Sequence, residues 1–338
     1  MRDTFRGTDE VQGYVLILAG GGGHTGFAYA LAQVLYGKVP LSFLAPEGDI
    51  LSGRRLSKFG EVKFLIKPRG PTTPIHEFAV RFAKAFVDSI GQVSREIMVM
   101  VSTGSNFCIP PAIIAWAKGI PVINIESEVR FLKASKTARI LQPFSTITAL
   151  QWEEQRRLLD GVVVGPLLPK PEFKPRKGDY ILVTGGTYGH KLLFDTLTES
   201  NLRNVILQTG KVNPAPYVKR HPEWKVITFT EKFHRLLAGA ELVITHFGST
   251  ALEAVVYGKP VILVPNPEWT RMAGIEDAEY FARKVNAVLI SEINLETILS
   301  AIDEARKREV PILRNGAENI ANIIIELTKE DAGQNLES

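Results

Sequence analysis

Cysteine is nearly absent from this sequence of 338 residues, in which Cys108 stands alone. A single cysteine excludes an internal disulfide framework and favours a reducing compartment, so we predict a cytoplasmic protein. No run of about 18 apolar residues occurs, and Met1–Gln12 has no signal-peptide pattern, so no membrane-spanning segment is predicted. The pattern Asp-x-Asp is missing too, which removes one common arrangement of carboxylates for a divalent cation.

The composition is that of an ordinary soluble globular protein, with 45% hydrophobic and 22% charged residues. The length favours two domains over one. Positive charge is concentrated in the first half: residues 1–165 contain 19 Lys and Arg against 14 Asp and Glu, whereas residues 166–338 contain 21 against 22. This excess indicates an anionic partner there, namely a lipid surface, a pyrophosphate or a nucleic acid, or simply a basic face exposed to water.

The most informative stretch is Leu242–Pro265, which reads as a strand, a turn, a helix and a second strand. The turn His246–Thr250 leads into a helix N-terminus, whose free N–H groups and positive dipole end suit a phosphate. Glu253 lies one turn further on, where a carboxylate can accept hydrogen bonds from ribose hydroxyls. The alternative is an N-capped helix in which Thr250 and Glu253 form a capping box.

A glycine-rich turn, Gly20–Gly26 (GGGGHTG), lies near the start of the chain between a predicted strand, Tyr14–Leu18, and a predicted helix, Phe27–Leu35. Its glycines satisfy G-x-G-x-x-G, and Glu47 follows about 20 residues later, as in the dinucleotide-binding fingerprint. An NAD(P)-dependent oxidoreductase is therefore one alternative function. His24 in this turn is a candidate catalytic base, although a lone histidine is by default structural.

The same order of strand, glycine loop and helix begins again with a predicted strand at Tyr180–Thr184. Between the two halves, Gly165–Gly178 carries four prolines and four Lys or Arg in 14 residues, which is typical of a linker. We therefore predict two Rossmann-like domains facing a cleft. The predicted limits are 1–165 for the first domain, 166–178 for the linker, 179–330 for the second domain and 331–338 for a polar tail.

Pro74–Val93 is predicted to be an amphipathic helix, with its apolar residues in one stripe bordered by Arg81 and Lys84. Two interpretations remain open for this helix. It packs on the sheet, or it faces a membrane, with aromatic residues among the headgroups and cations near anionic lipid.

Several motifs together carry a family resemblance. H-x-G-x-x-T-x-x-E in Leu242–Pro265, followed by G-K-P and a strand that ends in proline, resembles the donor-binding motif of MurG-type GT-B glycosyltransferases. That segment, LVTGGTYG and VILQTGK are also similar to the catalytic subunit of the two-subunit transferase that adds the second GlcNAc to dolichol-linked GlcNAc. Gly20–Gly26 resembles the GGxGGH loop of MurG and the opening of that enzyme's membrane-recruiting subunit, whose strand ending in Glu-Ser matches Glu126-Ser127. The chain thus resembles both subunits fused in that order.

The resemblance implies the GT-B fold, an α/β fold of two Rossmann-like parallel-sheet domains, with the last helix, about 314–329, crossing back onto the first domain. It implies no cofactor and no metal, although Glu126 and Glu128 form an E-x-E pattern. The donor-binding residues that it implies are Gly185, Gly186, Thr187, Gln208, His246, Gly248, Ser249, Thr250, Glu253, Glu276 and Asp277. The acceptor or pyrophosphate would be held by Gly22, Gly23, Thr25, Ser105 and Glu128.

One segment departs from the family pattern. The family carries Gln near the start of the helix after the second donor strand, whereas Glu276 and Asp277 stand in this region here. Both can accept hydrogen bonds from sugar hydroxyls, but neither can donate one to an acetamido carbonyl. The identity of the donor sugar therefore stays open.

The sequence predicts an inverting glycosyltransferase that moves GlcNAc, or a related sugar, from a UDP-sugar to a polyprenyl- or dolichyl-pyrophosphate-linked sugar. It would make a glycan precursor, as in N-glycosylation, as a peripheral enzyme on the cytoplasmic face of the membrane, without nucleic acid. His24 is the predicted base, with Glu126 as second choice or as the group that orients it. Backbone N–H groups of the Gly185–Thr187 and Gly248–Thr250 turns would stabilise the departing UDP. A UDP-GlcNAc 2-epimerase and a non-catalytic nucleotide-sugar sensor are two further candidate functions.

Overall fold

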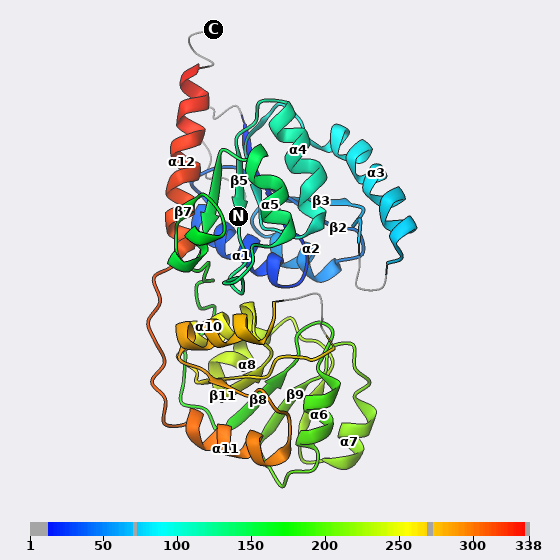
Figure 1. The fold of residues 1–338 in the computed structure, drawn as a ribbon, viewed down its shortest axis with the longest axis vertical. Coiled ribbons are helices and arrows are strands. Elements are labelled where there is room, and N and C mark those ends of the chain that lie inside the picture. The colour runs from blue at the N-terminus through cyan, green and yellow to red at the C-terminus, as the bar shows by residue number, and fades with distance from the viewer. Residues whose placement is uncertain (1–12, 70–72, 269–272, 335–338) are drawn as a thin grey trace, which may run out of the picture.

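The computed structural model describes residues 13–69, 73–268 and 273–334, which form two α/β domains, one above the other in Figure 1. The first holds a parallel seven-stranded sheet in the order β3-β2-β1-β4-β5-β6-β7. Its strands are β1 (Tyr14–Leu18), β2 (Leu41–Pro46), β3 (Glu61–Leu65), β4 (Ile97–Ser102), β5 (Val122–Ile125), β6 (Ile147–Leu150) and β7 (Val162–Val163). Its helices are α1 (Gly23–Leu35), α2 (Ile50–Leu56), α3 (Ile75–Gln92), α4 (Ile109–Ala117) and α5 (Lys136–Leu141).

The second domain holds a parallel six-stranded sheet in the order β10-β9-β8-β11-β12-β13. Its strands are β8 (Tyr180–Thr184), β9 (Val205–Gln208), β10 (Lys225–Ile227), β11 (Ala240–Thr245), β12 (Val261–Leu263) and β13 (Val288–Leu289). The helices that follow β8 are α6 (Lys191–Leu197), α7 (Ala215–Arg220), α8 (Phe233–Gly239), α9 (Ser249–Val256), α10 (Ile275–Val285), α11 (Leu295–Ala305) and α12 (Gly316–Gln334).

The central strands are apolar on both faces because helices cover both sides of each sheet. In β1, Val15 and Ile17 pack with α1 and α12, whereas Leu16 and Leu18 point to the other face and pack with α4. The second sheet repeats this arrangement, with α8, α9 and α10 on one face and α6 and α11 on the other. The alternation of strand side chains between two faces therefore gives each domain two cores.

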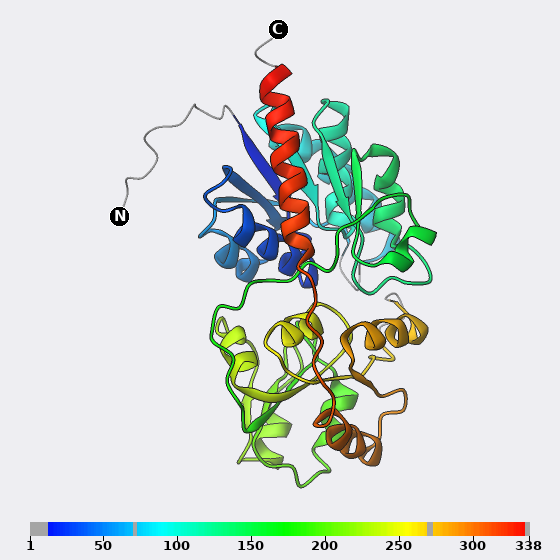
Figure 2. The same ribbon diagram turned by 90° about the vertical axis from the view of Figure 1, so that its left-hand side faces the viewer.

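The last helix, α12, belongs in space to the first domain. Its Ala317, Ile320, Ala321 and Ile324 are buried in the same core as α1. Figures 1 and 2 show the chain before it running along the second domain and α12 then lying beside the first sheet. The helix continues to Gln334, past residue 331, where we expected a polar tail to begin, while residues 335–338 lie outside the described part of the chain.

Both sheets reverse their strand order at one point, between β1 and β4 and between β8 and β11. Loops that leave the carboxyl ends of such strand pairs diverge and leave a crevice, where ligands of doubly wound sheets bind. The glycine turn after β1 and the turn after β11 lie at these two points. The fold thus places the glycine turn after β1 and the turn after β11 at the crevices of their sheets.

Candidate active site

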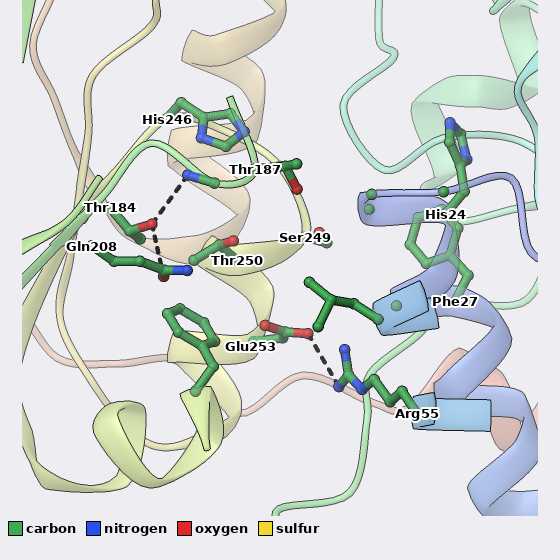
Figure 3. A pocket seen from close by; sticks show the side chains of 18 of the residues that line it. His24, Phe27, Arg55, Thr184, Thr187, Gln208, His246, Ser249, Thr250 and Glu253 are labelled. Carbon is green, nitrogen blue, oxygen red and sulfur yellow. Dashed lines mark hydrogen bonds and ion pairs between the residues drawn. The ribbon is translucent and has the colours of Figure 1, made fainter. Parts of the chain in front are cut away.

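A cavity of about 970 Å³ lies between the domains. It is lined by residues of the glycine turn after β1 and of the turns after β8 and β11. Figure 3 shows His24, Phe27 and Arg55 on one wall and His246, Thr187, Gln208, Ser249, Thr250 and Glu253 on the other. Most of the predicted site residues line it: Gly22, Gly23, His24, Glu128, Gly186, Thr187, Gln208, His246, Gly248, Ser249, Thr250 and Glu253. Tertiary structure therefore brings the predicted donor and acceptor motifs to one space.

The wall from the second domain is built around the N-terminus of α9. Its N-cap residue is Gly248, and no side chain caps the helix, so a capping box of Thr250 and Glu253 is not formed. The Ala251 N–H bonds the Gly248 carbonyl oxygen, and the N–H groups of Ser249 and Thr250 are thus left for a ligand. Next to them, Thr184 Oγ1 accepts from the Gly186 N–H at 3.1 Å and donates to Gln208 Oε1 at 3.2 Å, which fixes the second glycine loop (Figure 3).

The N-terminus of α1 faces that of α9 across the cavity. Helix α1 begins at Gly23, earlier than predicted, and it too has no side-chain cap. A Cβ atom at Gly23 would lie 3.0 Å from Ser249 Oγ of the other domain, so a side chain there would require the Ser249 side chain to shift. Two positive helix ends that face one cavity suit a ligand with more than one anionic group.

His24 lies in the first turn of α1 and is held in one orientation. Its Nδ1 donates to the carbonyl oxygen of Thr103 at 2.6 Å, because a carbonyl can only accept. The other nitrogen, Nε2, is therefore the one that can take a proton. Gly104, at φ +97°, makes room for the ring, since a Cβ there would lie 2.9 Å from His24 Cε1. Burial, assisted by the positive charge of Lys67, lowers the pKa of His24 to about 4.

Glu128 is the acidic residue that the loop after β5 presents to the cavity. Its Oε2 accepts from Ser127 Oγ at 2.9 Å, and burial raises its pKa to about 7. A carboxyl group with such a pKa is partly protonated at neutral pH, so it can donate or accept a hydrogen bond. Glu128 therefore has the properties of a residue that contacts a substrate hydroxyl or phosphate.

Glu126 corrects one of our predictions, because its carboxylate does not line the cavity. The side chain is fully buried, with Oε1 accepting from the Ser127 N–H at 2.6 Å and Oε2 from the Ser135 N–H at 2.8 Å. Both oxygens are thus engaged in shaping their own loop. Glu126 is neither placed to take a proton from a substrate nor hydrogen-bonded to His24, and Glu128 takes its place at the cavity.

Five further predicted residues also lie outside the cavity lining: Thr25, Ser105, Gly185, Glu276 and Asp277. Thr25 is buried and shares a 2.8 Å hydrogen bond with Ser52, and Ser105 contacts the Gly20 carbonyl oxygen at 3.4 Å. Glu276 is exposed, whereas Asp277 is buried and binds backbone N–H groups of the first domain. The expected recognition of a donor sugar by Glu276 and Asp277 is therefore not supported.

A polar network joins the domains beside Glu253. Arg55 lies 3.7 Å from Glu253 Oε1 (Figure 3). It also donates to His234 Nε2 at 3.0 Å. Its guanidinium lies over the Tyr29 ring at 3.9 Å, and the Tyr29 hydroxyl donates to Glu172 at 2.6 Å. His234, whose Nε2 lies 3.6 Å from Glu253 Oε1, and Arg55 hold the pKa of the Glu253 carboxylate below its ordinary value despite burial, so the group is charged.

Sequence reasoning missed several residues of the cavity. These are Leu51, Arg54, Arg55 and Lys58 from the region of α2, Glu172 from the connection, and Phe229, Thr230, Glu231, Phe233 and His234 before and within α8. No local signal marks the α2 residues, because an arginine on a short helix is ordinary. Phe229 is 39% exposed, which is unusual for phenylalanine, but exposure of that kind is visible only in three dimensions.

Comparisons with known proteins agree with this geometry. Residues 180–329 match the glycosyltransferase family 28 C-terminal domain. The chain is 25% identical, over 86% of each sequence, to the UDP-N-acetylglucosamine–N-acetylmuramyl-(pentapeptide) pyrophosphoryl-undecaprenol N-acetylglucosamine transferase of Salinibacter ruber. Among solved structures, MurG of Acinetobacter baumannii superposes with a TM-score of 0.63 at 18% identity, covering 92% of this chain and 99% of MurG.

A UDP-GlcNAc 2-epimerase of Methanocaldococcus jannaschii, solved with UDP-GlcNAc and UDP, superposes equally well, with a TM-score of 0.65 at 14% identity over 92% of this chain and 99% of the epimerase. Fold similarity alone therefore does not separate the two activities.

The two parallel sheets and the structural neighbours define the GT-B fold, and the sequence matches decide the enzyme class: the chain is a glycosyltransferase of the GT-B fold. Within that class it is similar to MurG, and residues 180–329 match the family 28 C-terminal domain. The fold and the enzyme class predicted from the sequence are confirmed.

Proposed function

We propose that this enzyme transfers GlcNAc from UDP-GlcNAc to a sugar on a lipid pyrophosphate, with inversion at the anomeric carbon. The observation that carries the proposal is sequence similarity over 86% of both chains to a transferase with such a donor and acceptor in its name. This similarity extends over both domains, as expected if the donor and the acceptor are both of the same kind as those of that transferase. The epimerase alternative rests on the fold alone.

The site residues have complementary roles in this reaction. The acceptor hydroxyl attacks the anomeric carbon while His24 Nε2 takes its proton. The bond from that carbon to the UDP oxygen breaks, and the N–H groups of the first turn of α9 stabilise the negative charge gained by the diphosphate. Glu253 accepts hydrogen bonds from the ribose, and the α1 N-terminus with Glu128 binds the acceptor side.

A mass-spectrometric assay tests this function. UDP-GlcNAc and a short-chain GlcNAc-pyrophosphoryl lipid should give a product one N-acetylhexosamine heavier, and activity should survive exhaustive EDTA treatment because no metal is proposed. Parallel reactions with an N-acetylmuramyl acceptor, and with dolichyl and undecaprenyl chains, identify the acceptor. Conversion of UDP-GlcNAc to its 2-epimer without any acceptor would refute the transferase, and loss of activity restored by Mg²⁺ would refute metal independence.

The resemblance of the first half to a membrane-recruiting subunit leads us to propose peripheral membrane binding through α3. Ile75, Val80, Val87 and Ile90 on this helix are 70, 71, 67 and 56% exposed, and only Ala85 and Ser89 of α3 are buried. The apolar side chains thus lie largely in water, beside Arg81 and Lys84. No helix in the described part of the chain is long and apolar enough to cross a membrane.

Val80→Glu should weaken binding to vesicles that contain anionic lipid by about tenfold, because an apolar contact is lost and a negative charge is added. Sedimentation with sucrose-loaded vesicles measures the effect. Val218→Glu is the matched control, since Val218 is 50% exposed on α7 of the second domain. Equal binding of both variants and the unmodified protein would refute a membrane role for α3.

A further inference from the structure

The loop between β5 and α5 forms the part of the cavity wall that carries Ser127, Glu128 and Val129. From within the first domain, Gln155 Nε2 donates to the carbonyl oxygens of Ser127 and Arg130 at 2.8 and 2.9 Å. Trp152 Nε1 donates to the Glu128 carbonyl oxygen at 2.8 Å. These bonds satisfy carbonyl groups of the loop but leave its N–H groups at Phe131 and Leu132 to be paired elsewhere.

Asp277 of the second domain pairs those two N–H groups. Its Oδ1 accepts from the Phe131 N–H at 2.7 Å and from the Leu132 N–H at 3.0 Å. Its Oδ2 accepts from the Gly274 N–H at 3.2 Å, which caps α10. The side chain is only 5% exposed, so both oxygens are used inside the protein and bridge residues 146 positions apart.

An aromatic contact supports the same joint. The Phe131 ring stacks on Tyr280 of α10, with centroids 5.5 Å apart, and lies 6.2 Å from the Trp152 ring on its own domain. Val129, Phe131 and Trp152 share a buried core with Phe281 and Ala282 of α10. The loop that presents Glu128 is therefore packed between its own domain and α10.

We propose that Asp277 is a positioning residue for the acceptor side of the site. Its carboxylate holds the Phe131–Leu132 backbone, and thereby fixes Ser127 and Glu128 at the cavity wall from the opposite domain. The Asp277 carboxylate thus acts on the protein backbone instead of on the donor sugar. This role rests on the proposed function, because that function identifies the acceptor. The hydrogen bonds from Phe131 and Leu132 to Asp277 do not depend on the proposed function.

Hydrogen exchange and steady-state kinetics on Asp277→Ala test the proposal. Without substrates, the amides of Phe131 and Leu132 should exchange faster, while those of α1 should not change. The KM for the lipid acceptor should rise about tenfold, as expected for the loss of hydrogen bonds to a charged group, while the KM for UDP-GlcNAc stays within about twofold. Asp277→Asn should largely restore the acceptor KM, because its amide oxygen still accepts from both N–H groups.

Glu279→Ala is the control, since it removes an exposed carboxylate from the same helix. Tyr280→Ala loosens the same joint without altering the carboxylate, and it should raise the acceptor KM even if Asp277→Ala fails to fold. Unchanged exchange at Phe131 and Leu132 would overturn the proposal, as would a rise in the donor KM alone, which would return Asp277 to the donor sugar. The two proposals can fail separately. An unmodified protein without transferase activity would refute the proposed function. Hydrogen exchange at Phe131 and Leu132 is measured without substrates, so it would still test the role of Asp277.

Discussion

Replacing His24 with alanine should lower kcat by about 10² to 10⁴, the range expected when a general base is removed. Its Nδ1 is committed to the Thr103 carbonyl oxygen, so Nε2 is the nitrogen that can receive the proton of the acceptor. UDP affinity should barely change, because the proposed UDP site lies on the other domain. Kinetics at saturating acceptor, with UDP binding by calorimetry, measure both quantities.

The protonation of His24 provides an independent check. Its pKa of about 4 lies below the ordinary value of 6.5, so the ring is neutral at physiological pH and becomes charged only as the pH falls toward 4. In NMR titrations of the ligand-free enzyme, the His24 signal should therefore stay that of a neutral ring at pH 5. A bound diphosphate should raise this pKa, because a nearby anion stabilises the imidazolium, and a more basic ring is a better proton acceptor.

Glu279→Ala serves as the control, because Glu279 is exposed on α10, away from the cavity lining. A rise in acceptor KM with little change in kcat would mean that His24 holds the acceptor pyrophosphate. Folded His24→Ala protein with near-normal kcat at saturating acceptor would refute the catalytic role. Glu128 would then be the base to test, since Glu126 does not line the cavity.

Glu253→Ala should weaken UDP binding by about 1–3 kcal/mol, the loss expected for hydrogen bonds to a charged group, or roughly 5- to 150-fold. The carboxylate is 7% exposed, lines the cavity one turn into α9 and is kept charged by Arg55 and His234. It is therefore a strong acceptor for ribose hydroxyls. Isothermal titration with UDP measures the loss, and Glu253→Gln, which keeps one acceptor oxygen, should lose less.

Two comparisons isolate the ribose contact from general charge effects. Glu231→Ala removes another cavity carboxylate, which is exposed and paired with Arg54 at 2.7 Å, and it should leave UDP affinity nearly unchanged. Measuring Glu253→Ala also in an Arg55→Ala background prevents a freed arginine from masking the loss by binding phosphate. Unchanged UDP affinity of Glu253→Ala in both backgrounds would show that the ribose assignment is wrong.

Local sequence patterns were sufficient to predict the features that depend on residues close together in the sequence. The apolar runs Tyr14–Leu18 and Tyr180–Thr184 form the predicted strands with the predicted limits. The glycine turns that follow them lead into helices, because glycine permits the tight backbone path from strand to helix. The positions of His24 and Glu253 at the cavity follow from such local geometry.

The direction in which a side chain points, and its contacts with other segments, were not predictable in this way. Glu126 and Glu128 are two positions apart in one loop, and only the path of that loop turns the first toward the Ser127 and Ser135 amides and the second toward the cavity. Arg55 reaches the site from α2, and nothing in its neighbourhood marks it. The backbone path of one loop decided the first outcome, and the packing of distant segments decided the second.

The sequence by itself therefore determined the two parallel-sheet domains, the glycine turns that lead into helices and the class of enzyme, since these depend on periodicity, turn residues and short motifs. That no side chain caps the two helix ends was decided by the tertiary structure. The tertiary structure alone decided which carboxylates face the cavity and which support it. It assigned Asp277 to the Phe131 and Leu132 amides, 146 and 145 residues away, and Glu126 to its own loop. The physical reason is that a buried carboxylate must find N–H partners, and the partner it finds depends on which segments folding brings within about 3 Å.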